Sequence, residues 1–487
     1  MRVLMILPAL CEAKGPFFRP IKYSLFPPLG LATLAAYLSP DDDVRIIDEH
    51  VERDVDPQRF IATPPDLVVI QTYITNARRS YRLADVFRRL GCFVALGGLH
   101  VTSLPDEAAP HADAIFLGPG EGLFPDFLER FRKNRNSARG VYDSRTAPRS
   151  IASIPPIRRD LIRRSKYLVP NSIVVTRGCP HHCTFCYKDA FFTGGRSFYT
   201  QRVDDALAEI DRLPGRHLYF LDDHLFGDVG FARALFEGMR GADRVFQGAA
   251  TVDSILRGDL VERAVDAGLR SIFVGFESLS EATLAFSSKR QNLLRDGRRV
   301  EYERAIRRLD SLGVSINGSF VFGLDGDGPD VFDRTVDWAR DQGLTTATFH
   351  IATPYPGTAY YREMRSAGRI RHSDWDLYDT RHVVFDPLNM TDTELERGYW
   401  RCYRRFYSAA NILKAGMRHE SRSFGLKCAA YAALWKRMEP MWNALIRLGV
   451  VGSMRPVIEA GLNAARSWKG GRRRDASAAR SIAETTL

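Results

Sequence analysis

Cysteine is scarce in this chain, and its scarcity excludes a fold held together by disulfides. Only 7 of the 487 residues are cysteine, whereas small secreted scaffolds place several bridges in far fewer residues. Four of the seven, Cys11, Cys92, Cys402 and Cys428, are scattered singly. The other three lie close together, which indicates a metal or redox role in a reducing compartment. We therefore expect a cytoplasmic protein.

The sequence also lacks a hydrophobic run long enough to cross a bilayer. Its longest uncharged stretch, Tyr23–Pro40, contains Pro27, Pro28 and Gly30 near its start. Only about ten residues remain for a helix, where a membrane span needs about 20. The apolar start of the chain is interrupted at Pro8, so we interpret it as a buried first strand and not as a signal peptide.

The chain shows neither a strong compositional bias nor a repeat beyond alternating strands and helices. Hydrophobic residues make up 45% and charged residues 26%, which excludes a fibrous or wholly disordered protein. The net charge of +11 permits contact with phosphates, an anionic cofactor or a membrane surface, but it identifies none of these.

Two series of strand and helix patterns predict an α/β fold. Apolar runs without alternation are typical of parallel strands that are buried on both faces. In the first series these runs are Val3–Ile6, Val44–Ile47, Leu67–Gln71, Phe93–Gly97 and Ala114–Leu117. Their alternation with helices predicts a doubly wound, Rossmann-like sheet, which binds ligands at the carboxyl ends of its strands.

The second series predicts a partial (β/α)6 barrel, because six repeats are too few for the usual eightfold barrel. Its candidate strands are Ile173–Thr176, His217–Leu221, Val245–Ala250, Ser271–Gly275, Ser315–Val321 and Ala347–Ile351. We predict five segments in all. These are a cofactor-binding domain (1–135), a linker rich in Arg, Ser and Pro (136–165), the barrel (166–385), a helical C-terminal domain (386–468) and a disordered basic tail (469–487).

The three clustered cysteines follow the first predicted barrel strand. Cys179, Cys183 and Cys186 have the spacing C-x3-C-x2-C, so their thiolates can ligate three irons of a [4Fe–4S] cluster and leave the fourth iron open. A zinc ion would need a fourth ligand, and the adjacent His181 and His182 cannot easily complete a tetrahedron in so tight a loop. Zinc or inert thiols remain the alternative.

This motif, placed after the first strand of a six-unit barrel, resembles the radical S-adenosylmethionine (SAM) superfamily. The resemblance implies that Cys179, Cys183 and Cys186 hold the cluster and that its open iron binds the amino and carboxylate groups of SAM. One electron then cleaves the sulfonium to give a 5′-deoxyadenosyl radical, so that the cofactor supplies the difficult chemistry.

The resemblance also implies SAM contacts at the ends of later barrel strands. Glu277 is the expected ribose contact, and Asp222 or Asp223 would accept a hydrogen bond from the SAM ammonium. The segments around Gly323 and Gly357 would let the backbone approach the adenine and close the site. For each carboxylate the alternative is a buried group that is satisfied by backbone N–H groups.

A second set of motifs resembles the B12-binding domain of cobalamin-dependent radical SAM enzymes. The set consists, in chain order, of Pro27–Leu31, Ile46–Asp48, Gly97–Thr102 and Gly118–Gly122. By this resemblance Gly97 and Gly98 allow a flat macrocycle to approach the sheet edge. Gly118 and Gly120, which open a helix, suit the corrin amides or the nucleotide tail.

Three further positions of this domain are candidates for contact with cobalamin. His100 follows the fourth strand, and the sequence leaves open whether it contacts the corrin, ligates cobalt or caps the turn. Thr72 and Tyr73 are expected to form a lower-face wall, with ordinary packing as the alternative for Tyr73. His50 lies in a sequence similar to the Asp-x-His-x-x-Gly pattern of cobalamin mutases. Because Arg53 replaces the glycine, we interpret His50 as a surface or hinge residue.

Three reactions fit this resemblance. The first is methylation of an unactivated carbon of a small, hydrophobic metabolite such as a hopanoid, another isoprenoid or a tetrapyrrole. One SAM would methylate cobalamin and a second would supply the radical. The second is cyclisation or oxidation, as in the anaerobic Mg-protoporphyrin ester cyclase. The third is tRNA methylthiolation, but those relatives carry an additional N-terminal cysteine cluster, whereas Cys11 and Cys92 are isolated.

The expected partners follow from these hypotheses. They are a small-molecule substrate and an electron donor such as flavodoxin or ferredoxin, with no nucleic acid. The segment Phe424–Leu462 combines apolar and basic residues near helical spacing. It either packs against the barrel or forms a patch that contacts a membrane surface.

Overall fold

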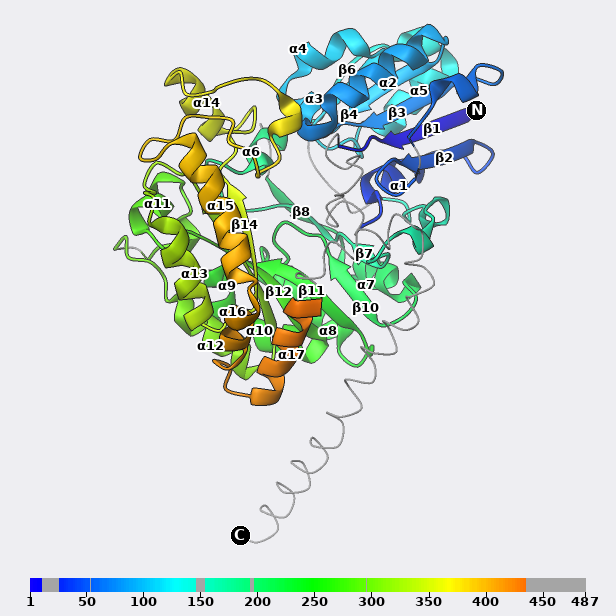
Figure 1. The fold of residues 1–487 in the computed structure, drawn as a ribbon. Helices are drawn as coiled ribbons and strands as arrows, with labels where there is room; N and C mark the ends of the chain where they lie inside the picture. Colours follow the sequence, from blue (N-terminus) through cyan, green and yellow to red (C-terminus); the bar gives the residue numbers. More distant parts are fainter. Residues whose placement is uncertain (11–25, 53, 146–153, 193–196, 295, 435–487) are drawn as a thin grey trace, which may run out of the picture.

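The computed structural model describes residues 1–10, 26–52, 54–145, 154–192, 197–294 and 296–434. Two six-stranded sheets, in which neighbouring strands are parallel, form its framework (Figure 1). The α/β class, the doubly wound N-terminal sheet and the six-stranded barrel that the sequence predicts are thereby confirmed.

The N-terminal sheet has the strand order β2-β1-β3-β4-β5-β6. Its strands are β1 (Arg2–Leu7), β2 (Asp43–Asp48), β3 (Leu67–Gln71), β4 (Phe93–Gly97), β5 (Ala114–Leu117) and β6 (Gly140–Asp143). The first five coincide with the predicted apolar runs. The sixth lies in the segment that we predicted to be a linker and pairs with β5 at the edge of the sheet.

Helices cover both faces of this sheet, as a doubly wound fold requires. On one face α1 (Leu29–Ala35) and α5 (Phe124–Lys133) bury their apolar sides against β1 and β4. On the other face α2 (Ala77–Arg89), α3 (Leu99–Ser103) and α4 (Pro105–Ala108) cover the sheet. In the inner strands β1, β3, β4 and β5, alternate side chains belong to one or the other of these two cores, which explains the continuous apolar runs.

The second sheet forms the partial barrel, in the order β14-β13-β12-β11-β10-β7. Its strands are β7 (Ser172–Ile173), β10 (His217–Phe220), β11 (Val245–Ala250), β12 (Leu269–Glu277), β13 (Ser315–Phe322) and β14 (Thr346–Ile351). The predicted first strand, Ile173–Thr176, is divided. Its end belongs to β8 (Thr176–Gly178), which pairs instead with β9 (Phe198–Thr200) in an antiparallel ribbon.

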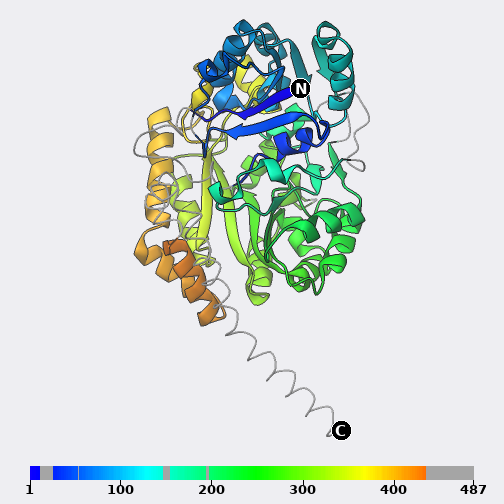
Figure 2. The same cartoon turned by 90° about the vertical axis from the view of Figure 1, so that its right-hand side faces the viewer.

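Helices cover the outer side of the barrel sheet and pack against it to form the largest part of the core (Figure 2). They are α7 (Val203–Arg212), α8 (Val229–Met239), α10 (Leu260–Ala267), α12 (Tyr302–Ser311) and α13 (Val331–Asp341). Shorter helices follow several strands: α9 (Val252–Leu256), α11 (Glu281–Phe286) and α14 (Ala359–Ser366).

The C-terminal helices close the last edge of the barrel (Figure 1). They are α15 (Asp392–Phe406), α16 (Ala409–Gly416) and α17 (Arg422–Ala432). Tyr403 of α15 and Tyr407, which directly follows that helix, place their hydroxyls on the backbone of β14, where they accept from the N–H groups of Phe349 at 3.1 Å and Ala347 at 2.9 Å. The segment 435–487, which includes the predicted tail, lies outside the described residues. Among the described residues, no helix combines the length and the apolar character that crossing a membrane requires.

Candidate cofactor site between the two sheet edges

The three clustered cysteines lie in one loop between β8 and α6 (Tyr187–Phe191). Cys183 is buried, and Cys179 and Cys186 are partly exposed. Burial raises the pKa of Cys179 to about 11, and the neighbouring Cys183 thiol adds to this rise. Burial also raises the pKa of Cys186, which has both other thiols as electrostatic neighbours. The three thiols thus lie close enough to interact electrostatically.

Each of the three sulfurs has an N–H donor of its own. The backbone N–H of His181 lowers the pKa of Cys179 by hydrogen bonding, and the backbone N–H of Lys188 does the same for Cys186. The side-chain amide of Gln291 donates to Cys183 Sγ at 3.4 Å. Hydrogen bonds to sulfur stabilise the negative charge that iron ligation requires.

A buried lysine that the sequence analysis did not single out shapes the cysteine loop. The Lys188 side chain is 1% exposed, and its ammonium donates to the carbonyl oxygens of Cys179, at 2.9 Å, and His181. It also forms an ion pair with Asp189 at 2.7 Å. The loop is therefore folded around one cation.

Two predicted carboxylates follow β10 and differ in environment. Asp222 Oδ1 accepts from the backbone N–H groups of Val175 and Thr176, while its Oδ2 is buried and has no hydrogen-bond partner. Burial raises the pKa of Asp222 to about 6. Asp223 accepts from the Tyr187 hydroxyl at 2.7 Å. One oxygen of Asp222 is thus satisfied by backbone N–H groups, as the alternative interpretation of this carboxylate expects. The other oxygen can accept a hydrogen bond from a ligand.

Glu277 ends β12 in an unusual backbone conformation. Its φ of 64° is in the left-handed region, and the pairing register with β13 shifts at this point. Strained backbone of this kind concentrates at functional sites. The Glu277 carboxylate accepts from the buried Lys289 ammonium at 2.9 Å and from Ser319 Oγ at 3.3 Å. Lys289 was not predicted, because it lies in a loop without a periodic pattern.

The two predicted glycine segments of the barrel lie in turns after β13 and β14. Gly323 has φ 88°, and a Cβ there would lie 2.6 Å from the Leu395 side chain. A Cβ at Gly357 would meet Ala190 of α6 at 2.8 Å and Ser103 of α3 at 3.3 Å. Gly357 therefore lies where the barrel, the cysteine loop and the N-terminal domain meet.

On the N-terminal side, the predicted residues occupy the carboxyl edge of the sheet. Gly97 ends β4, and a Cβ at Gly98 (φ 114°) would lie 2.7 Å from the backbone oxygen of Thr72. Close packing of two loops is thus a sufficient reason for Gly98. Thr72 is buried, and its hydroxyl has no hydrogen-bond partner. The Tyr73 hydroxyl accepts from Gln71 at 2.9 Å.

Tyr73 and Tyr187 link the two edges. Their side chains are 42% and 37% exposed, yet burial raises the pKa of Tyr73. Asp223, followed by burial and with a contribution from Tyr73, holds the pKa of Tyr187 well above its ordinary value. The two tyrosines thus lie close to each other, one on each domain, and both are accessible.

Gly118 and Gly120 lie in the loop after β5, beside the same edge. A Cβ at Gly118 would lie 2.8 Å from Ser144 Oγ, whereas one at Gly120 would meet only Leu34 at an ordinary 3.5 Å. In the same loop Glu121 forms a 3.2 Å ion pair with Arg177 of β8. This pair joins the two domains beside the cysteine loop.

His100 is fully buried, and the contacts of its ring describe a structural role. Its Nε2 lies 2.9 Å from a Glu107 oxygen, and Trp375 packs against the ring edge-on with centroids 5.5 Å apart. Trp375 Nε1 donates to the same carboxylate. His100 Nδ1 is buried and has no hydrogen-bond partner. His100 therefore attaches the segment after the barrel to the N-terminal domain.

The interpretation of His50 as a surface residue is wrong. Its side chain is only 5% exposed, and Nδ1 lies 2.8 Å from Asp48. Tyr167 donates to the other oxygen of Asp48 at 3.0 Å. The carboxylate draws the ring inward, because a buried charge needs hydrogen-bonding partners.

The inner face of the barrel carries neutral polar and aromatic side chains. The residues that alternate with the core-facing ones are all partly exposed: Tyr219, Gln247, Phe273, Asn317, Thr348 and His350. Gln247 donates to the Tyr219 hydroxyl at 3.3 Å, and Thr348 to Asn317 at 3.3 Å. In a complete barrel this layer would be packed. Here it offers an accessible surface for a ligand.

The donor set fits the expected cofactors. Thiolates with N–H donors suit an iron–sulfur cluster, and the unpartnered buried acceptors Asp222 Oδ2 and Gln291 Oε1 suit donors on a polar ligand. Thr72 and Tyr73 offer hydroxyls at the opposite edge.

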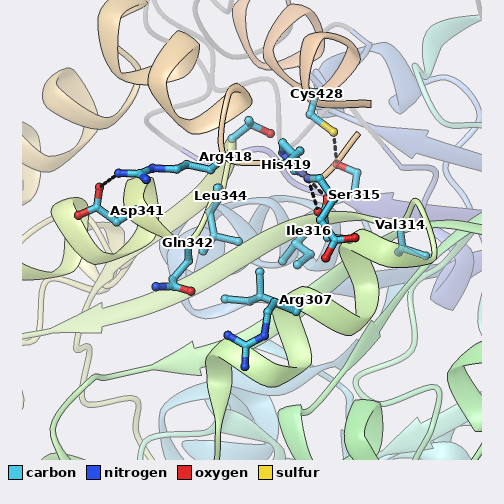
Figure 3. Close-up of a pocket in the computed structure, with 15 residues that line it drawn as sticks. Arg307, Val314, Ser315, Ile316, Asp341, Gln342, Leu344, Arg418, His419 and Cys428 are labelled. Atoms are coloured by element: carbon cyan, nitrogen blue, oxygen red, sulfur yellow. Dashed lines mark hydrogen bonds and ion pairs between the residues drawn. The ribbon is translucent and has the colours of Figure 1, made fainter. Parts of the chain in front are cut away.

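A separate cavity of about 310 Å³ lies at the other end of the barrel (Figure 3). It is placed at the amino ends of β13 and β14, where Arg418 pairs with Asp341 at 3.5 Å and His419 with Asp310. Ligands of barrel enzymes bind at the carboxyl ends of the strands, so this cavity is not the cofactor site.

The geometry is that of an enzyme which presents an iron–sulfur cluster at one sheet edge and a second cofactor at the other. The Radical SAM superfamily matches residues 173–339, and the B12 binding domain family matches residues 23–128. The chain belongs to the radical SAM enzymes that carry a B12-binding domain.

Individual proteins of this kind are similar along most of the chain. The bacteriochlorophyllide d C-12(1)-methyltransferase of Chlorobaculum tepidum is 29% identical, over 80% of this chain and 84% of its own length. The anaerobic magnesium-protoporphyrin IX monomethyl ester cyclase of Rubrivivax gelatinosus is 25% identical, over 78% and 74%. The solved structure of the cobalamin-dependent SAM radical enzyme OxsB shares the fold, with a TM-score of 0.64, 15% identity and coverage of 90% of this chain and 72% of that one.

Proposed function

We propose that this chain methylates an unactivated carbon of a hydrophobic small molecule, with a tetrapyrrole as the first class to test. The observation that carries the proposal is the proximity of Tyr73, at the edge of the N-terminal sheet, to Tyr187, beside the cysteine loop: the two partly exposed side chains are close enough to interact electrostatically. Both relatives compared above are named for tetrapyrrole chemistry. When bound, the cluster, SAM and cobalamin supply a carbon-centred radical and a methyl group.

The residues of this chain have separate tasks in the proposal. Cys179, Cys183 and Cys186 hold the cluster. Asp222 and Glu277 contact SAM from the ends of β10 and β12. Thr72 and Tyr73, with the open Gly120 turn, contact the corrin from the N-terminal edge. The neutral inner face of the barrel binds the substrate and excludes water, which protects a radical from side reactions.

A single anaerobic preparation tests the proposal. The full chain is reconstituted with iron, sulfide and hydroxocobalamin, and iron and cobalt are quantified, with about four irons and one cobalt per chain expected. It is then incubated with dithionite, SAM bearing a CD3 group, and bacteriochlorophyllide d or magnesium-protoporphyrin monomethyl ester as probes. Formation of 5′-deoxyadenosine together with transfer of CD3 to a probe supports methylation.

The cyclase relative keeps a second function open, since its similarity covers most of this chain. Formation of 5′-deoxyadenosine with probe consumption but no CD3 in the product would overturn methylation and establish cyclisation or oxidation. Iron without cobalt would contradict both the methyl transfer and the assignment of the N-terminal edge.

We further propose a flavodoxin or ferredoxin as the electron donor and contact with an anionic membrane surface. Three exposed apolar residues, Leu413 of α16, Met417 directly after it and Leu426 of α17, lie among Lys414 and Lys427. This combination favours an anionic interface. The full chain should co-sediment with vesicles containing anionic lipid and not with neutral ones. Absence from both pellets would contradict the membrane contact.

A further inference from the structure

The side-chain amide of Gln291 is the most informative contact of the cysteine loop that lies outside the motif. Its Nε2 lies 3.4 Å from Cys183 Sγ, although 108 residues separate the two in the chain. Cys179 and Cys186 receive their N–H donors from the backbone of their own loop. Cys183 instead receives its side-chain donor from a different element, the short helical turn Arg290–Asn292.

This turn is fixed to the barrel on both sides of Gln291. Asn292 is fully buried, and its amide donates to the carbonyl oxygens of Gly275 at 3.0 Å and Phe276 at 2.9 Å. Lys289 is tied to the end of β12 through Glu277. Two neighbours thus anchor the backbone, and the position of the Gln291 amide is determined before any cofactor binds.

The cysteine loop meets the same segment a few residues earlier. The backbone N–H of Thr184 donates to the carbonyl oxygen of Ser287 at 3.0 Å. Gln291 itself is only 9% exposed, so water competes little for its amide. The amide orientation also agrees with the chemistry, because the opposite one would direct a carbonyl oxygen at a thiolate.

We propose that Gln291 is a positioning residue that raises the reduction potential of the cluster by donating to Cys183 Sγ. A hydrogen bond to sulfur stabilises the more negative, reduced cluster more than the oxidised one. The barrel strand that ends at Glu277 thereby controls how readily the cluster accepts its electron. The inference rests on the proposal that the three cysteines hold the cluster.

The test is a redox titration of the reconstituted full chain, monitored by electron paramagnetic resonance without SAM or substrate. Gln291→Leu removes the donor at similar volume and should lower the reduction equilibrium constant about tenfold, which is about 59 mV for one electron. Gln291→Glu places an acceptor at the sulfur and should lower it further. Gln342→Leu, the same change at the far end of the barrel, is the control and should leave the potential unchanged.

The outcomes separate this inference from the cluster assignment. Wild-type protein that binds no iron contradicts the cysteine assignment. Intact clusters with equal potentials in wild type, Gln291→Leu and Gln291→Glu overturn the role of Gln291 alone. If neither variant assembles a cluster, the test is made on the reduced wild type, labelled with ¹⁵N in its glutamine side chains. Its electron paramagnetic resonance spectrum is examined for a coupling between nitrogen and the cluster. A nitrogen coupling to the cluster supports the hydrogen bond, and its absence overturns it.

Discussion

At the residue scale, Asp327 is a buried carboxyl group below the Gly323 turn. Its Oδ2 accepts from the Gly323 N–H at 3.0 Å, but burial raises its pKa from 3.8 to about 7. Between about pH 4 and pH 7 the folded chain therefore keeps a proton that the unfolded chain has lost, and stability falls as pH rises through this window.

Replacing Asp327 with Asn removes this titration. As the pH is raised from 5 to 7.5, wild type should lose melting temperature and Asp327→Asn should not, so that the difference between them changes in favour of the variant. Thermal unfolding of the apoprotein at each pH measures this difference. Melting temperatures that change with pH by the same amount in both proteins would contradict the shifted pKa. Asp330→Asn, a change at an exposed acidic residue nearby, serves as the control.

The buried pair of Glu277 and Lys289 gives a second prediction at this scale. Lys289→Met leaves the Glu277 carboxylate without its ammonium, and removal of one partner of a buried ion pair costs about 3–5 kcal/mol. The additional change Glu277→Gln should recover much of that loss, because no uncompensated charge remains. Urea denaturation of the two single variants and the double variant measures the coupling. Simple additivity would show that the two groups act independently.

At the scale of elements, α15 protects the edge strand of the barrel. The Tyr407 hydroxyl both accepts from the Ala347 N–H and donates to the Ala347 oxygen. Tyr403 contacts the backbone of Phe349 in the same way. An exposed strand edge can pair with another chain, and the two hydroxyls occupy these backbone groups of β14.

The corresponding prediction concerns Tyr403→Phe and Tyr407→Phe. Each change removes hydrogen bonds to the strand and should cost about 1 kcal/mol. Hydrogen exchange should increase at the amides of Phe349 and Ala347 in β14 and remain unchanged in β12, which lies inside the sheet. Exchange that increases throughout the barrel would indicate global destabilisation and contradict a local role of α15.

The strands and loops of this protein show which parts of a structure can be predicted from its sequence. Buried parallel strands were predicted closely, because an apolar run is dictated by burial on both faces. Strand β6 was missed because it is short and half exposed at the sheet edge.

The site residues Lys289 and Gln291 were missed for another reason, because Gln291 contacts a residue that is distant in sequence and Lys289 lies in the same loop. A loop that reaches a site only in the folded structure leaves no periodic signal in the sequence. Lys188 lies two residues after the cysteine motif, and a charged residue so close to three clustered cysteines was the signal available.

At the scale of the whole molecule, the two cofactors are assigned to different domains. Cys183→Ala should abolish reductive SAM cleavage, because the cluster loses a ligand, while cobalamin binding stays largely intact. The measurements are 5′-deoxyadenosine formation and the visible spectrum of bound cobalamin. Cleavage at the wild-type rate would contradict the cysteine assignment. Loss of cobalamin would show that the two domains load together.

The opposed sheet edges have a consequence for biogenesis. Arg177 and Glu121 join the two domains beside the cysteine loop, and the Gly357 turn lies against both Ser103 and Ala190. A corrin that binds at the edge of the N-terminal sheet would lie beside these contacts. We therefore expect cobalamin uptake to be most complete when the macrocycle is present while the two domains dock, during synthesis or during refolding.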